Sequence, residues 1–265
     1  MIHNDIPVVI LAGGFGTRLR EQTEFIPKPM VPIGTKPILW HIMKIYSHYG
    51  FKRFIICLGY KGEIIKDYFL QYKFRSNNFT INLGNHEDIR FHSSHNEEDW
   101  QVTLADTGLK TMTGARVKGI EKYIDTNYFL LTYGDGVANI EIEKLVEFHL
   151  SHGKIATVTG IMPPSRFGAL LTEGNQVIEF SEKTQVGSSL INGGFFAFNR
   201  GIFSYLQEGD ECTLEREPLE KLAKDGQLMV YHHTGFWQCM DTPRDINLLN
   251  EYLESGHAPW KIWED

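Results

Sequence analysis

A glycine-rich loop near the amino end of the chain has the residue types that bind phosphate. Residues Leu11–Leu19 read LAGGFGTRL, with three glycines and one arginine. Glycine lets backbone N–H groups approach phosphate oxygens closely, and the planar guanidinium of Arg18 can bind two such oxygens at once. The loop is not a Walker loop, which ends in Gly-Lys-Ser/Thr, and Leu19 stands where the dinucleotide fingerprint has its third glycine. The segment therefore predicts a phosphate-binding loop of another kind.

A lysine between two prolines follows ten residues after Arg18. Pro27 and Pro29 stiffen the backbone on both sides of Lys28. Between residues 11 and 36 four basic residues stand against two acidic ones, so this segment carries +2 and, since the net charge is −7, the rest of the chain carries −9. The loop, Arg18 and Lys28 together predict an electropositive site for an anion on an acidic protein.

Two aspartates far apart in the sequence could join this site. Asp135 lies between Gly134 and Gly136 after an apolar run, and Asp241 follows an aromatic run. Because 106 positions separate the two carboxylates, only the fold can bring them together. By residue type alone, an aspartate at a strand end can instead cap a turn or a helix.

The surrounding sequence predicts the elements that must position these residues. Continuous apolar runs predict buried strands at 6–11, 53–59, 128–132 and 155–161, and apolar residues at helical spacing predict helices at 37–49, 63–72 and 141–152. This alternation predicts an α/β fold with a Rossmann-like, mixed but mostly parallel sheet flanked by helices, and places ligands at the carboxyl ends of its strands. His149 and His152 end the third helix, where positive charge favours the helix dipole.

The carboxyl-terminal half of the sequence has a different pattern of predicted elements. Short strands are expected at 168–172, 176–180 and 190–198, and helices near 214–224 and 243–255. They predict a smaller antiparallel β elaboration of the sheet. Since no linker, repeat or low-complexity tract divides the chain, we expect a single domain of residues 1–265.

Composition excludes several classes of protein. The 265 residues are 42% apolar and 22% charged, which is typical of a soluble globular protein. The acidic balance argues against a general nucleic-acid binder, and no window approaches a membrane span, so we expect neither nucleic acid nor membrane as a partner. Three cysteines without CxxC spacing indicate a reducing compartment, and we expect a cytoplasmic protein.

Motifs spread along the chain resemble a known enzyme family. The segment LAGGFGTRLREQTEFIPKPM resembles the signature of the sugar-phosphate nucleotidyltransferases, or nucleotide-sugar pyrophosphorylases. Within that family, KPILWHIMKIYSHYGF, TYGDGVA, INGGFF, GFWQCMDTPRD and APWKIWED resemble the glucose-1-phosphate cytidylyltransferases. These matches reach from Val8 to the carboxyl end. The resemblance implies that CTP and glucose 1-phosphate are the substrates and that CDP-glucose and pyrophosphate are the products.

The resemblance also implies a mechanism without a protein nucleophile. The sugar phosphate supplies the attacking oxygen, so the protein must align two mutually repelling anions and stabilise the charge of the transition state. Arg18, Lys28 and Asp135 are then the catalytic residues. Asp135 and Asp241 are implied as ligands of Mg²⁺, an ion that prefers one or two carboxylates plus phosphate oxygens.

Binding residues follow from the same resemblance. The part of the chain at about 1–160 is expected to bind the nucleotide, and the part at about 161–265 to bind the sugar phosphate and complete the metal site. The implied nucleotide contacts are Leu11, Ala12, Gly13, Gly14, Phe15, Gly16, Thr17, Arg18, Lys28, Thr107, Arg116 and Gly134. The implied sugar-phosphate contacts are Arg166, Glu182, Lys183, Asn192 and Gly193. By residue type, Asn192 and its glycines could instead form a β-bulge.

Two departures from the family pattern leave alternatives open. Thr184 replaces a proline after Lys183, and Ser165 replaces a glycine before Arg166, which slightly favours a changed sugar preference. One alternative is therefore an enzyme that uses UTP or dTTP or another sugar. The other is a catalytically silent nucleotide-sugar-binding protein, which the presence of both aspartates, Arg18 and Lys28 disfavours.

A polar, histidine-rich insert lies at residues 84–100, with one short strand expected near 89–92. A long insert in a compact α/β domain is usually functional or disordered. In the cytidylyltransferases that the chain resembles, an insert in this region reaches an adjoining subunit. We therefore expect a homo-oligomer in which this segment is shared between subunits.

Overall fold

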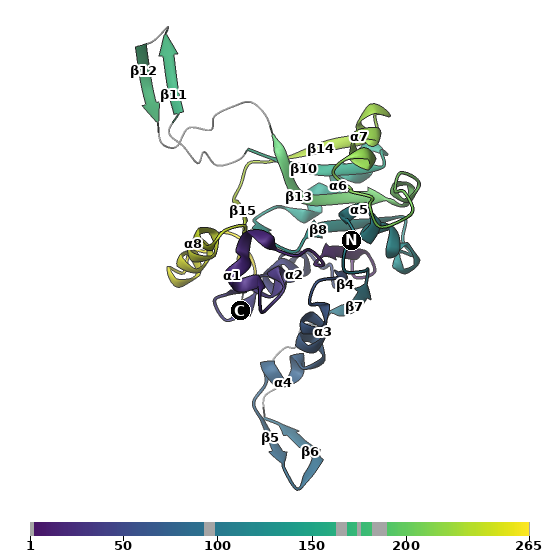
Figure 1. The fold of residues 1–265 in the computed structure, drawn as a ribbon, viewed down its shortest axis with the longest axis vertical. Coiled ribbons are helices and arrows are strands. Elements are labelled where there is room, and N and C mark those ends of the chain that lie inside the picture. Colours follow the sequence, from purple (N-terminus) through teal and green to yellow (C-terminus); the bar gives the residue numbers. More distant parts are fainter. Residues whose placement is uncertain (1–2, 93–98, 163–168, 174–175, 182–189, 265) are drawn as a thin grey trace.

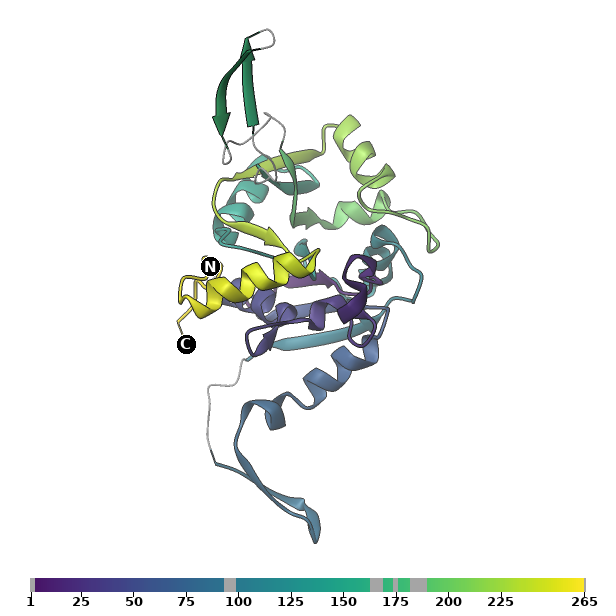
Figure 2. The same cartoon turned by 60° about the vertical axis from the view of Figure 1, so that its left-hand side comes forward.

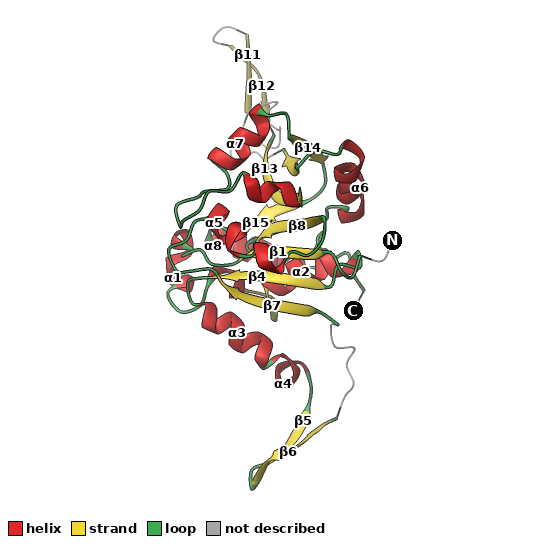
Figure 3. Ribbon diagram, turned by 90° about the vertical axis from the view of Figure 1, so that its right-hand side faces the viewer, coloured by secondary structure: helices red, strands yellow, loops and turns green. Residues whose placement is uncertain are grey.

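The centre of the molecule is a seven-stranded sheet. The computed structural model describes residues 3–92, 99–162, 169–173, 176–181 and 190–264. The strands lie in the order β14, β10, β13, β8, β1, β4 and β7 (Figures 1 and 3). Their bounds, in that order, are Leu228–His233, Ala156–Ile161, Ile191–Asn199, Tyr128–Tyr133, Pro7–Leu11, Arg53–Leu58 and Gln101–Asp106.

Strand directions make the sheet mixed and mostly parallel. β1 pairs in parallel with β4 on one side and with β8 on the other, and the β4–β7 and β10–β14 pairs are parallel too. β13 runs antiparallel to both of its neighbours, β8 and β10. The predicted α/β fold with an antiparallel part in its carboxyl-terminal half is confirmed. Because β1 and β8 are parallel neighbours, the glycine loop after β1 and Asp135 after β8 meet at one edge of the sheet.

Helices cover both faces of this sheet, because the central strands have apolar side chains on both faces. The strand β1 is an example. Val8 and Ile10 belong to one apolar cluster, with side chains of α2, α6 and α8, whereas Val9 and Leu11 belong to a second cluster, with side chains of α5 and α7. The bounds of α1 to α8 are Arg20–Thr23, Ile38–His48, Gly62–Leu70, Tyr72–Ser76, Thr113–Gly119, Ile142–His152, Glu217–Lys224 and Pro243–Glu254. Figure 2 shows α8 beside the amino-terminal elements. Among the described residues, no helix is long and apolar enough to cross a membrane.

Smaller elements complete the described part of the chain. Antiparallel pairs form between β2 and β3, β5 and β6, β9 and β15, and β11 and β12. The bounds are Pro32–Ile33 (β2), Lys36–Pro37 (β3), Phe79–Asn82 (β5), Asn85–Phe91 (β6), Gly136–Ala138 (β9), Ala169–Glu173 (β11), Gln176–Ser181 (β12) and Trp237–Cys239 (β15). Short 3-10 helices span Thr17–Leu19, Lys28–Met30, Glu121–Tyr123 and Arg200–Ser204. The β5–β6 and β11–β12 hairpins stand away from the main sheet at opposite ends of the long axis (Figure 1).

Two strands of the main sheet escape the sequence prediction, and both are edge strands. Along β7 only Ala105 is buried, and β14 has no buried residue, so neither sequence carries the continuous apolar run of a central strand. The helix predicted at 63–72 is divided at Gln71 into α3 and α4. The short strand expected near 89–92 is part of the longer β6, which pairs with β5.

Candidate active site

A pocket of about 520 Å³ opens at the carboxyl ends of β1 and β8. The glycine loop contributes Leu11, Ala12, Gly13, Gly14, Gly16, Thr17 and Arg18 to its lining. The other predicted site residues in the lining are Lys28, Gly134, Asp135, Asn192, Gly193 and Asp241. Phe15 of the same loop contacts the ring of Tyr60 instead, with the ring centroids 5.3 Å apart. The fold therefore gathers segments from both halves of the chain around one cavity.

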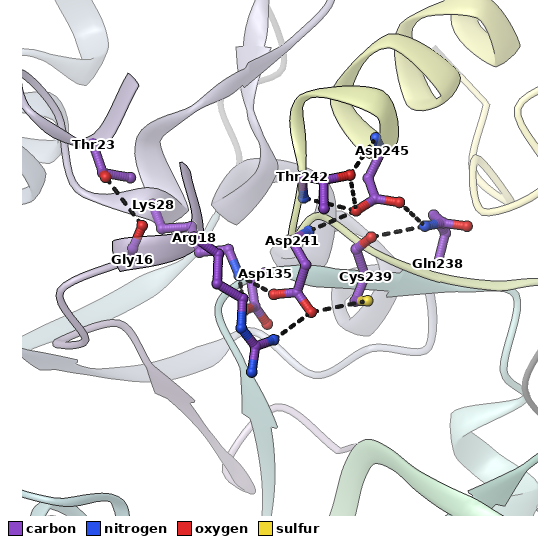
Figure 4. A network of polar contacts seen from close by, with 10 residues as sticks. All are labelled: Gly16, Arg18, Thr23, Lys28, Asp135, Gln238, Cys239, Asp241, Thr242 and Asp245. Atoms are coloured by element: carbon purple, nitrogen blue, oxygen red, sulfur yellow. Dashed lines mark hydrogen bonds and ion pairs between the residues drawn. The ribbon is translucent and has the colours of Figure 1, made fainter. Parts of the chain in front are cut away.

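Four charged side chains form a cluster in this pocket. The Lys28 ammonium lies 2.6 Å from Asp135 Oδ2 and 2.7 Å from Asp241 Oδ1 (Figure 4). The Arg18 guanidinium lies 2.8 Å from the other oxygen of Asp241, Oδ2. The Lys28 side chain is 12% exposed and that of Arg18 is 74% exposed, so the lysine sits inside the cluster and the arginine on its rim.

The electrostatics of the cluster favour the charged forms of Lys28 and Asp241. Burial alone lowers the pKa of Lys28, but the charge of Asp135 and the hydrogen bonds to both carboxylates outweigh it, and the pKa is raised above its ordinary value. Burial raises the pKa of Asp241, but the hydrogen bond from Lys28 and the charges of Lys28 and Arg18 outweigh that, so its pKa is lowered. At neutral pH the pocket therefore presents the charged Lys28 ammonium beside the charged Asp241 carboxylate.

Backbone geometry explains why Lys28 points into the pocket. Pro27 is extended, and Lys28 then begins a 3-10 turn in which the Met30 N–H donates to the Pro27 carbonyl at 2.8 Å. The Val31 N–H closes the turn on the Lys28 carbonyl at 3.1 Å. Proline is suited to the start of such a turn because its φ is already near the helical value. The rigid Pro-Lys-Pro segment expected from the sequence is present.

Asp241 is held by a residue that the sequence analysis missed. Oδ2 of Asp245 accepts hydrogen bonds from the backbone N–H groups of Asp241 and Thr242 at 3.0 and 2.8 Å. Its Oδ1 accepts from Gln238 Nε2 at 2.9 Å (Figure 4). Thr242 and Asp245 also form a capping box at the start of α8. The spacing Thr-x-x-Asp before a helix is the signal that could have indicated this role.

A direct backbone contact joins the two aspartate segments. The Met240 N–H donates to the carbonyl of Asp135 at 2.8 Å, and Cys239 of β15 lies opposite Gly136 of β9. The Cys239 thiol lies 3.6 Å from Asp241, and burial together with the nearby carboxylates raises its pKa to about 12. Cys239 is therefore a neutral thiol at the pocket wall and not a nucleophile.

Arg116 and Thr107 lie behind the glycine loop. Arg116 is buried, and its guanidinium donates to the carbonyls of Leu58, Gly108 and Gly13 at 2.9, 2.7 and 3.1 Å. It also donates to the Thr107 hydroxyl at 2.8 Å, and that hydroxyl donates to Leu58 at 2.7 Å. In this arrangement both residues support the loop from the protein side. Arg166, Glu182 and Lys183 lie outside the described residues and remain predictions.

Further residues line the pocket that the sequence did not indicate. Thr113, Tyr133, Trp237 and Cys239 line the cavity but were not among the expected site residues. Trp237 Nε1 donates to the Gly193 carbonyl at 2.7 Å, which ties β15 to the sugar-phosphate side expected from the sequence. Tyr133 and Trp237 could have been suspected, since each stands inside a motif next to a predicted site residue.

The donor set fits a hard divalent cation with few protein ligands. Asp135 and Asp241 already converge on one cation, the Lys28 ammonium. Among the described residues no group of three or more His, Cys, Asp or Glu side chains could hold a metal ion. Two carboxylates suffice for Mg²⁺ when phosphate oxygens and water complete its coordination.

The chain matches a known protein family over nearly its whole length. The sequence pattern of the nucleotidyl transferase family matches residues 7–265. The chain belongs to this family. Its match runs through every segment that lines the pocket, so the cluster of Lys28, Asp135 and Asp241 is the candidate active site of a nucleotidyl transferase.

Individual relatives are similar along almost their full length. The glucose-1-phosphate cytidylyltransferase of Salmonella typhi is 50% identical over 258 residues, which cover 97% of this chain and 99% of that protein. The probable glucose-1-phosphate cytidylyltransferase of Bacillus subtilis is 46% identical over 255 residues, covering 96% and 99%. The crystal structure of HddC from Yersinia pseudotuberculosis complexed with GMP-PN superposes with a TM-score of 0.68 at 25% identity, covering 94% of this chain and 99% of that chain.

Proposed function

We propose that this nucleotidyl transferase is a glucose-1-phosphate cytidylyltransferase, which converts CTP and α-D-glucose 1-phosphate into CDP-glucose and pyrophosphate. The observation that carries the proposal is the convergence of Lys28, Arg18, Asp135 and Asp241 beside the glycine loop in one pocket. The choice of base and sugar is supported by the 50% identity to the Salmonella typhi cytidylyltransferase.

The reaction requires positioning and charge stabilisation from the protein. A phosphate oxygen of the sugar phosphate attacks the α-phosphorus of CTP in line, the bond between the α-phosphorus and the bridging oxygen breaks, and pyrophosphate leaves with that oxygen. Both substrates are anions, so the barrier depends on holding them together and neutralising the charge that develops.

The nucleotide is assigned to the part of the chain at about 1–160. The exposed backbone N–H groups of the glycine loop and the Arg18 guanidinium would bind the triphosphate. Lys28, largely buried at the centre of the cluster, would stabilise charge on the α-phosphate because a fixed ammonium in a partly dry site acts more strongly than one in water. Arg116 and Thr107 would act through the loop that they support.

The divalent cation that the family resemblance implies would be Mg²⁺, held by Asp135 and Asp241. When bound, this ion neutralises triphosphate charge and orients the phosphates for in-line displacement. The chain's own contribution is the fixed pair of carboxylates, one on each side of the Met240–Asp135 backbone contact. Asp245 keeps Asp241 in place through the Asp241 N–H.

The sugar phosphate is assigned to the part at about 161–265. Asn192 and Gly193 line the same pocket as the glycine loop and would contact the sugar hydroxyl groups. Glu182, Lys183 and Arg166 are expected to bind the phosphate and sugar from the segment between β10 and β13. The whole chain, residues 1–265, would then act as one catalytic domain with the reacting groups at the junction of its two parts.

We also propose a cytoplasmic homo-oligomer. The β5–β6 hairpin extends away from the main sheet (Figure 1). Its Phe79 and Ile81 and the neighbouring Leu83 are exposed, Leu83 by 74%. Apolar side chains on an extended hairpin are typical of a surface that another chain covers. The three free cysteines, two of them buried, fit a reducing compartment.

A pyrophosphate-release assay tests the proposed function. Purified protein is incubated with Mg²⁺, glucose 1-phosphate and, in separate reactions, CTP, UTP, dTTP, ATP or GTP. We expect turnover with CTP and formation of CDP-glucose, identified by mass. Exclusive use of UTP or dTTP would reassign the base, and no turnover with any sugar phosphate would favour a nucleotide-sugar-binding protein.

A further inference from the structure

The pocket wall between β8 and α7 carries a chain of hydrogen bonds centred on Glu215. Its Oε1 accepts from the Tyr133 hydroxyl at 2.5 Å, and its Oε2 accepts from the Thr113 hydroxyl at 2.6 Å. Tyr133 and Thr113 both line the pocket, whereas Glu215 stands one layer behind them. One carboxylate thus holds two hydroxyl groups of the wall.

The chain continues from Tyr133 to Asn192. Asn192 Nδ2 donates to the Tyr133 oxygen at 3.2 Å, and Asn192 Oδ1 accepts from the Gly194 N–H at 2.8 Å. These two contacts determine which end of the amide is nitrogen and which is oxygen. One amide N–H and one lone pair of Oδ1 remain for a ligand in the pocket.

Each bond in this chain has a single possible direction. A carboxylate has only acceptor oxygens, so the Tyr133 hydroxyl must donate its single proton to Glu215. Toward Asn192 the Tyr133 oxygen can then act only as the acceptor of the amide N–H. A carboxylate acceptor also strengthens the first bond of the chain relative to a neutral one.

Close packing prevents Tyr133 from turning away. A Cβ at Gly194, where φ is +81°, would lie 2.6 Å from Cδ2 of the Tyr133 ring. The ring therefore rests directly on the Gly194 backbone, beside the N–H that binds Asn192. Thr113 is fixed independently, since its hydroxyl accepts from the Leu214 N–H at 3.0 Å.

From this geometry we infer that Glu215 is a positioning residue for the sugar-phosphate substrate, which acts through Tyr133 to fix the amide of Asn192. This inference rests on the proposed function, in which Asn192 contacts a sugar hydroxyl. Glu215 acts on the substrate only through the side chains of Tyr133 and Asn192. Its removal therefore frees the Asn192 amide to rotate and removes no group that touches CTP.

A double-mutant cycle on the substrate KM values tests this role. We expect Glu215→Ala and Tyr133→Phe each to raise the KM for glucose 1-phosphate about tenfold, the scale of one lost hydrogen bond. The KM for CTP should stay within about twofold of the wild type, as for distant sites that share no partner. In an Asn192→Ala background, Glu215→Ala should add nothing. Glu215→Gln should restore most of the affinity, because its amide oxygen still accepts from Tyr133.

Glu211→Ala is the matched control, since Glu211 is an exposed carboxylate on the same segment. It should leave both KM values unchanged. An equal rise in both KM values for Glu215→Ala, or an undiminished effect in the Asn192→Ala background, would reduce Glu215 to a merely structural role. Thermal unfolding of each variant identifies any that do not fold.

Failure of the proposed function is distinguishable from failure of this inference. The double-mutant cycle is run with whichever nucleotide and sugar phosphate the wild type turns over. It therefore still tests the role of Glu215 if the substrates differ from CTP and glucose 1-phosphate. If the wild type turns over none, crystal structures of the wild type and Glu215→Ala decide the positional claim. A rotated Asn192 amide in the variant supports it, and an amide still bonded to Tyr133 and Gly194 overturns it.

Discussion

The Lys28 ammonium and the Asp135 carboxylate lie 2.6 Å apart although 107 positions separate them in the chain. The contact exists because β1 and β8 are parallel neighbours and the segments that follow both strands turn to the same edge of the sheet. In the proposed function, this positive and this negative group lie where a nucleotide phosphate and its counter-ion would meet.

Lys28→Ala should reduce kcat by about 10²-fold or more, the scale of losing one preorganised transition-state contact. The reason is that, in the proposed function, the largely buried Lys28 ammonium would lie beside the α-phosphate. Among the described residues that line the pocket, the other cation is Arg18, which lies on the rim. Steady-state pyrophosphate release measures the effect. Lys36→Ala is the control, because the Lys36 ammonium lies over the Trp40 ring, 5.5 Å from its centroid. Equal losses in both variants would remove the special role of Lys28.

Asp135→Asn should abolish turnover while leaving the fold intact. The substitution keeps the side-chain shape but removes the negative charge that would hold Mg²⁺, and the carboxylate is partly exposed at the end of β8. Activity, Mn²⁺ binding by electron paramagnetic resonance and the unfolding temperature are compared with those of Asp225→Asn, an exposed position that accepts from Tyr205. An unchanged kcat would take Asp135 out of the metal site.

Gly13→Ala should destabilise the protein much more than Gly14→Ala. A Cβ at position 13 would lie 2.3 Å from the Arg116 guanidinium, which its hydrogen bonds hold in place, whereas a Cβ at position 14 meets nothing within 4 Å. We expect Gly13→Ala to cost about 2 kcal/mol of unfolding free energy and Gly14→Ala less than about 0.5 kcal/mol. Urea unfolding measures both.

The variants Gly13→Ala and Gly14→Ala also distinguish a residue that supports the loop from a residue that contacts the substrate. Gly14 lines the pocket, so a methyl group there should raise the KM for CTP while the protein stays stable. If Gly13→Ala were as stable as the wild type, Arg116 would be free to move and could not be the support of the loop.

Stability should decrease as the pH falls from about 6.5 to 4. Burial lowers the pKa of His41 and of His149 to about 4 from an ordinary value of 6.5, despite hydrogen bonds that favour the charged form. Between these values the unfolded chain binds more protons than the folded one, so acid favours unfolding. Each histidine can contribute up to about 1.4 kcal/mol per pH unit.

Urea unfolding at pH 7 and pH 5 tests this dependence. His149→Gln should lower stability at pH 7 but flatten the dependence on pH, whereas His257→Gln, at an exposed position, should leave the slope unchanged. Identical slopes in His149→Gln and the wild type would contradict the assignment. The sequence-based interpretation of His149 and His152 as charges at the end of α6 is wrong, because burial lowers the pKa of both and leaves them neutral at pH 7.

Local sequence patterns predicted the centre of the fold well. β1, β4 and β8 are buried on both faces, so their sequences are continuous apolar runs, and α2 presents buried residues at helical spacing. The edge strands β7 and β14 lack a continuous apolar run because each has a neighbouring strand on one side only and is partly exposed to solvent. Pattern recognition therefore succeeds where burial is complete and fails at the margins of the sheet.

Long-range contacts explain what the sequence could not predict in the site. The motif resemblance indicated Arg116 as a nucleotide contact. It did not indicate that the Arg116 guanidinium would donate to the carbonyls of Leu58, Gly108 and Gly13. Glu215 carries no motif, and its bond to Tyr133 spans 82 positions. The packing of helices and strands determines which residues become such partners. A motif based on spacing along the sequence therefore cannot predict them.

The burial of Trp260 and Trp263 has a consequence for how the protein unfolds. Both rings belong to the same apolar cluster as Val8 of the first strand, and Trp260 Nε1 approaches His41 at 3.5 Å. Segments that share one packed cluster open together as a cooperative unit. Residues 260–263 therefore leave the interior only when the cluster around the first strand opens with them.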